Sequence, residues 1–181
     1  VARRGGNGGW TIDVVSADES SGESCELGLI DGQLVTAFTH GDQLRFATRQ
    51  ANGNWQVQTV DSPNNVVVGR DMDMVIRNNV PYIAHQDATN GLLRLSRRSN
   101  GQWTTVATPA PGDLDGDGLP DQFGFRPALL VLNDDIRIMH GLVPALPDQG
   151  SDYSLRQSTI GHNLAAFDTV NVQAVGFGGG Q

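Results

Sequence analysis

The chain has 181 residues, of which 38% are hydrophobic and 18% charged, and its formal net charge is −8. This composition excludes a disordered tail, and no apolar run approaches the roughly 20 residues of a membrane-spanning helix. All twelve basic residues are scattered arginines, so no basic stripe is present to bind nucleic acid. The 23 glycines favour short strands and tight turns, and therefore an all-β fold.

The chain opens on Val1 instead of Met, which suggests a processed or excised N-terminus, and residues 1–8 are expected to form a flexible segment. A short Gly-Trp pattern then begins a repeat, with Trp10, Trp55 and Trp103 separated by 45 and 48 residues. Spacing of this size is typical of β-propeller blades. Residues 10–16 are predicted to be one orphan outer strand.

Three four-stranded blades are predicted in turn at about 25–60, 70–107 and 125–173, followed by a Gly-rich tail at 174–181. In each blade two apolar strands separated by a tight polar turn lead into a second hairpin. The tryptophan strand closes the first two blades, and Leu164 or Phe167 is expected to take that place in the third. The fold class is thus an all-β propeller over residues 9–173.

Between blades two and three, the run from Asp113 to Asp121 predicts a Ca²⁺ loop. Carboxylates at positions one, three, five and nine converge when the loop curls, and the carbonyl at position seven adds an oxygen. Gly124 stands where an EF-hand has its Glu, so the loop is of a shorter type. The expected ligands are Asp113, Asp115, Asp117, Leu119 and Asp121. The alternative is a solvated acidic turn without a metal.

The Gly-x-Trp pattern, a Gly before each inner strand, and the run from Ile83 to Leu95 resemble the tandem propeller repeats of secreted bacterial proteins. Those repeats are distantly similar to sialidase-like and lectin propellers, and the calcium loop resembles the hairpins of integrin-type propellers. The resemblance implies a propeller and a secreted or cell-surface location. It does not imply one activity, because such repeats occur both in binding modules and in enzymes.

One end of the predicted propeller gathers polar residues, since the starts of the inner strands and the turns after the second strands emerge there. Three histidines are expected at equivalent places, each two residues after Phe38, Ile83 or Ile138. They are interpreted as packing positions, with a metal centre or sugar contacts as the sharper alternatives. Arg45, Arg94 and Arg156 at equivalent third-strand positions are interpreted as interblade or surface pairs. The candidate ligand-binding residues are His40, Asp42, His85, Asp87, His140, Glu26 and Asp73, with Glu23, Arg70, Asp71 and Arg126 nearby.

Three blades and one strand are too few to close a ring, because propellers use four to eight blades. We therefore expect another copy, or another protein segment, to complete it. The favoured function is a secreted, calcium-stabilised binding or assembly module. The alternatives are a lectin whose repeated pockets bind glycan, and a polysaccharide hydrolase or lyase with Glu26 and Asp73 as acid and base. No nucleophile motif is present, so catalysis is the minority hypothesis.

Overall fold

The computed structural model describes residues 1–114, 118–132, 135–143, 154–161 and 163–173. All regular structure in these ranges is β-strand, which confirms the predicted fold class, and they contain no helix able to cross a membrane. The strands are β1 (Ala2–Arg4), β2 (Trp10–Ile12), β3 (Ser21–Ile30), β4 (Gln33–His40), β5 (Gln43–Arg49), β6 (Trp55–Asp61), β7 (Val68–Arg77), β8 (Val80–Asp87), β9 (Leu92–Ser99), β10 (Gln102–Ala107), β11 (Gln122–Leu132), β12 (Asp135–Val143), β13 (Ser154–Gly161) and β14 (Asp168–Gln173).

Twelve of these strands form three antiparallel four-stranded sheets in sequence order, here called blade 1 (β3–β6), blade 2 (β7–β10) and blade 3 (β11–β14). The inner hairpins of blades 1 and 2 turn at Asp31-Gly32 and Asn78-Asn79, whose four residues all have positive φ. Such residues suit the two-residue turns that match strand twist. The remaining strands, β1 and β2, pair with each other in a separate two-stranded sheet.

The structure differs from the sequence-based boundaries at several places. Residues 1–8, expected to be flexible, contain β1, because this segment finds a partner in the predicted outer strand. Each blade also begins a few residues before the predicted start, since its inner strand continues past a bulge. The predicted tail at 174–181 lies outside the described residues.

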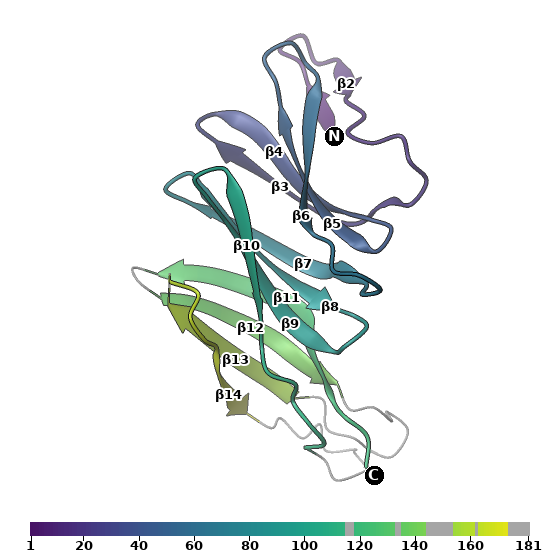
Figure 1. The fold of residues 1–181 in the computed structure, drawn as a ribbon. Coiled ribbons are helices and arrows are strands. Elements are labelled where there is room, and N and C mark those ends of the chain that lie inside the picture. Colours follow the sequence, from purple (N-terminus) through teal and green to yellow (C-terminus); the bar gives the residue numbers. More distant parts are fainter. Residues whose placement is uncertain (115–117, 133–134, 144–153, 162, 174–181) are drawn as a thin grey trace, which may run out of the picture.

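The three blades stand side by side, face against face, and the chain runs from one end of the row to the other (Figure 1). Val35, Leu44 and Phe46 of blade 1 pack against Met72 and Ile83 of blade 2. A second apolar cluster fills the space between blades 2 and 3. Blade 2 is therefore covered on both faces, which explains why almost every residue of β8 is buried.

Close contacts set the separation of blades 1 and 2. A Cβ atom added at Gly28 would collide with the terminal Cδ1 of Ile76, so a larger residue here would force the Ile76 side chain to move where β3 approaches β7. The Trp103 ring meets Phe46 edge-on with centroids 5.1 Å apart, and thus lies across the neighbouring blade. The indole N–H of Trp103 is buried without a hydrogen-bond partner.

Candidate functional site

A polar pocket of about 300 Å³ lies where the inner strands of blades 1 and 2 begin. Its lining comes from the ends of β3, β7 and β8: Glu23, Ser24, Arg70, Asp71 and Gln86. The register shifts of β3 and β7 turn these side chains out of the regular alternation of the strand. Arg70 Nη2 stands 3.6 Å from Glu23 Oε2, so the pocket presents both charges to a ligand.

Glu26 and Asp73 occupy the same repeat position on neighbouring inner strands, opposite Ala37 and Ala84 respectively. Burial raises the pKa of Glu26 above its ordinary value, and the negative charge of Asp73 raises it further. Asp73 Oδ2 accepts a hydrogen bond of 2.6 Å from the backbone N–H of Leu129 in blade 3. The fold thus brings together the two carboxyl groups that the sequence singled out, Glu26 with a raised pKa and Asp73 as the acceptor of a backbone hydrogen bond.

The register of the sheets corrects the predicted equivalence of the three histidines. His85 and His140 each stand five residues after the first residue of the second strand of their blade. The same position in blade 1 is Phe38, and His40 lies two residues further, opposite Gln43. A displacement of two residues keeps a side chain on the same face of a strand, so alternation alone did not reveal it.

His85 and His140 are buried parts of a repeated hydrogen-bonded trio. His85 Nε2 lies 3.1 Å from Ser96 Oγ, which lies 2.8 Å from Thr105 Oγ1. In blade 3 the corresponding atoms are His140 Nε2, Ser158 Oγ and Thr169 Oγ1, separated by 2.9 and 2.7 Å. Burial is the main reason why the pKa falls to about 3 for His85 and to about 4 for His140. Both imidazoles are therefore neutral near pH 7.

Blade 1 replaces this trio with apolar residues throughout. Phe38, Ala47 and Val57 take the positions of His85, Ser96 and Thr105, as the pairings of Ala47 with Val57 and of Ser96 with Thr105 show. The serine and threonine partners were missed by sequence reasoning. The sequence does contain a serine at the same place in the third strands of blades 2 and 3, and a threonine two residues after Trp103. That these residues are neighbours can be recognised only from the sheet register.

The other predicted ligand residues do not converge on the histidines. Asp87 is fully buried, accepts hydrogen bonds from Asn90, and lies 3.2 Å from Arg94 Nη1. Arg94 also pairs with Asp61 of blade 1 at 2.7 Å, as expected for an arginine that links blades. Asp42 is exposed at its turn, and His40 Nδ1 lies 2.7 Å from Ser21 Oγ. Within the described ranges no three His, Cys, Asp or Glu side chains form a metal-binding group.

Part of the predicted calcium loop can be placed. Asp115 and Asp117 lie outside the described residues, whereas Asp113, Leu119 and Asp121 are described. Asp121 is buried, and its Oδ2 accepts a hydrogen bond of 2.9 Å from the N–H of Leu114. Its Oδ1 is buried with no hydrogen-bond partner. Asp113 Oδ2 accepts a hydrogen bond of 2.9 Å from the N–H of Gly118, so a carboxylate at each end of the loop accepts a hydrogen bond from a backbone N–H within the loop.

Comparison with known proteins shows the fold. No family model and no curated protein sequence matches the chain. Among solved structures, it is similar to the α-L-arabinofuranosidase Arb93A from Fusarium graminearum in complex with an iminosugar inhibitor, with a TM-score of 0.56 and 10% identity. A point mutant of that enzyme with an iminosugar inhibitor gives 0.55 and 11%. Each match covers 84% of this chain and 49% of the other, so the chain spans about half the length of these structures.

Proposed function

We propose that the chain is an arc of a larger β-propeller ring and acts as a binding or assembly module. The observation that carries this proposal is the pair of apolar faces at the two ends of the row of blades, which no other described strand covers completely. On blade 3, Leu130 and Leu155 are 51% and 45% exposed, and Leu27 and Leu29 are exposed on blade 1. A neighbouring blade on either face would bury these side chains, each worth about 1.5–3 kcal/mol when fully covered.

The likeness to a chain about twice as long supports the same conclusion, because the present arc covers only about half of that fold. Sedimentation velocity over a range of protein concentrations tests it. We expect species heavier than the 19.3 kDa chain, and we expect Leu130→Asp to weaken their formation. Thr11→Asp, on the exposed β2, is the matched charge control. A stable monomer at all concentrations would contradict self-assembly.

We also propose that Ca²⁺ orders the loop from Asp113 to Asp121, in a secreted or cell-surface protein where calcium is abundant. The support is the buried, unpartnered Oδ1 of Asp121, which is a hard oxygen donor of the kind that Ca²⁺ prefers. Asp113 and the carbonyl of Leu119 would contribute further oxygen atoms, with Asp115 and Asp117 completing the predicted set. A chelator should lower the thermal midpoint, and adding excess Ca²⁺ should restore it.

A second candidate function is glycan binding at the polar pocket, or glycan cleavage by Glu26 and Asp73, which lie on the same two inner strands but do not line the pocket. The proximity of these two carboxyl groups and the raised pKa of Glu26 favour cleavage, since glycosidases use a pair of carboxyl groups, one of them with a raised pKa. An aryl α-L-arabinofuranoside is the first probe, chosen from the enzyme that the fold resembles. Loss of hydrolysis in both Glu26→Gln and Asp73→Asn, but not in Glu19→Gln, would support catalysis. Binding on a glycan array without turnover would support a lectin instead.

A further inference from the structure

The hairpin of β1 and β2 has the register of an outer blade hairpin. In blades 1 and 2 the third strand pairs with the fourth so that an arginine stands opposite the tryptophan. The small N-terminal sheet has the same pairing; the three pairs are Arg4 with Trp10, Arg49 with Trp55, and Arg98 with Trp103. The β1–β2 hairpin therefore corresponds to the third and fourth strands of a further blade, which lies ahead of blade 1.

Among the described residues, none covers the inner strand of blade 1 on the side of that further blade. Leu27 and Leu29 of β3 are 55% and 61% exposed, whereas Leu129 and Val131, at the same repeat positions in blade 3, are both 7% exposed. Blade 2 covers the latter pair. The glycine at the start of each inner strand shows the same contrast. A Cβ atom at Gly69 would lie 3.1 Å from Leu44 of the preceding blade, whereas one at Gly22 would meet nothing within 4 Å.

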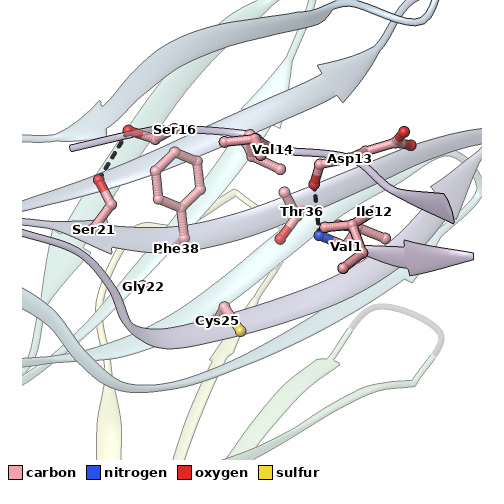
Figure 2. A pocket seen from close by; sticks show the side chains of 11 residues that line it. Val1, Ile12, Asp13, Val14, Ser16, Ser21, Gly22, Cys25, Thr36 and Phe38 are labelled. Carbon is pink, nitrogen blue, oxygen red and sulfur yellow. Dashed lines mark hydrogen bonds between the residues drawn. The ribbon is translucent and has the colours of Figure 1, made fainter. Parts of the chain in front are cut away.

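The outer half of the same face is already covered. Residues that follow β2 lie across Phe38 and Thr36, and enclose a pocket of about 330 Å³ that reaches Cys25 (Figure 2). Arg3 and Arg49 both bond to Asp13, at 2.7 and 2.9 Å, and fix the hairpin to blade 1. The covered part of this face of blade 1 ends at β1. In the described chain β1 pairs only with β2, so its other edge is free.

Building on the proposed ring, we propose that the free edge of β1 and the exposed face of β3 form the docking surface for one two-stranded antiparallel β-hairpin. This hairpin supplies the first and second strands of the further blade, and its second strand leads into β1 as β8 leads into β9. A second copy of the chain does not suit this place, because each of its three complete blades already uses its four strands.

The surface also defines the chemistry of the hairpin. The hairpin is expected to present apolar residues at alternate positions toward Leu27 and Leu29. In blade 2, Tyr82 and Ala84 of β8 are such residues and pack toward blade 3. On its other face, Ala2 stands opposite Ile12, the same apolar pairing that Ala47 and Val57 make beside Phe38. The second strand therefore carries an apolar residue, and no histidine, at the position that corresponds to Phe38.

The test adds a copy of residues 68–94 directly ahead of Val1, with His85→Phe in the copy, so that its last three residues continue into β1. Cys25, the single cysteine of the chain and exposed on the docking surface, reports coverage by its rate of alkylation. The hydrogen-exchange rate of the Ala2 amide reports strand pairing. Val1 and Asp13 are joined by two backbone hydrogen bonds, one in each direction, so the N–H of the next residue, Ala2, points away from β2 toward the free edge. We expect at least tenfold slower alkylation and slower exchange at Ala2.

The control fusion carries Tyr82→Asp and Ala84→Asp in the added copy, and should leave Cys25 as reactive as in the parent chain. If the fusion does not fold, the same 27 residues added as a free peptide to the parent chain give the same readout, because the peptide should slow alkylation. Unchanged reactivity in both arms would overturn the proposal. The proposal would also be overturned if Cys25 of the parent chain became less reactive as the concentration of the chain rose, since a second copy would then occupy the surface. The mass in solution reports on ring assembly, and Cys25 on this surface alone, so either proposal can fail without the other.

Discussion

The buried histidines of blades 2 and 3 make the stability of this protein depend on pH. The pKa of His85 is lowered to about 3 and that of His140 to about 4, mainly because burial disfavours the imidazolium. In the unfolded chain both titrate near 6.5. As the pH falls below that value, both imidazoles bind a proton in the unfolded state but stay neutral in the folded state. The free energy of unfolding therefore falls, by about 2 kcal/mol for each histidine between pH 7 and pH 5.

Blade 1 supplies the perturbation that isolates this effect. Changing His85→Phe, Ser96→Ala and Thr105→Val converts the blade 2 trio to the residues found in blade 1, and leaves no hydroxyl of the trio unpaired. We expect the triple variant to lose about 2 kcal/mol less than the parent on going from pH 7 to pH 5. The corresponding triple change in blade 3, at His140, Ser158 and Thr169, is the matched comparison and should have an effect of the same size.

Urea unfolding at both pH values measures the difference. Burial raises the pKa values of Glu26 and Asp61, so these carboxyl groups act in the opposite direction and partly offset the loss in every variant. The blade 3 variant keeps both carboxyl groups and changes no contact of Asp61, whereas His85 lies 3.7 Å from Asp61. If parent and variants lost the same free energy between the two pH values, the neutral buried histidines would not be the cause.

Three further changes test the packing and the loop. Gly28→Ala should lower the free energy of unfolding by about 1 kcal/mol in urea titrations, because the new methyl group displaces the end of the Ile76 side chain; an unchanged midpoint would show that Ile76 adopts another rotamer without cost. Arg94→Ala should cost about 3 kcal/mol, because it leaves the fully buried Asp87 without its cation; Arg156→Ala, whose guanidinium Nε bonds to a serine hydroxyl, should cost less in the same assay. In thermal scans, Asp121→Asn should remove most of the calcium stabilisation, which for the parent is about 2.7 kcal/mol at 100 times the dissociation constant; an undiminished shift would exclude this carboxylate as a ligand.

Much of the architecture could be predicted from local patterns. The spaced tryptophans, the turn pairs such as Asn78-Asn79 and the alternating apolar strands all act over a few residues, so they are legible in the sequence. The repeated arginines were predicted to form interblade or surface pairs, and Arg94 is of the interblade kind. These features depend on hydrogen bonding and burial within one hairpin or between adjacent repeats.

Register and proximity were decided only by the tertiary structure. A strand repeats its facing every two residues, so His40 looked equivalent to His85 until cross-strand hydrogen bonds showed a displacement of two. The approach of Glu26 to Asp73, and the meeting of His85, Ser96 and Thr105, depend on how strands distant in sequence are held side by side. Local patterns were enough to assign these segments to strands of stacked blades. Which side chains meet between them was decided by packing, because contact across a sheet or between blades depends on the position of a partner that local sequence does not contain.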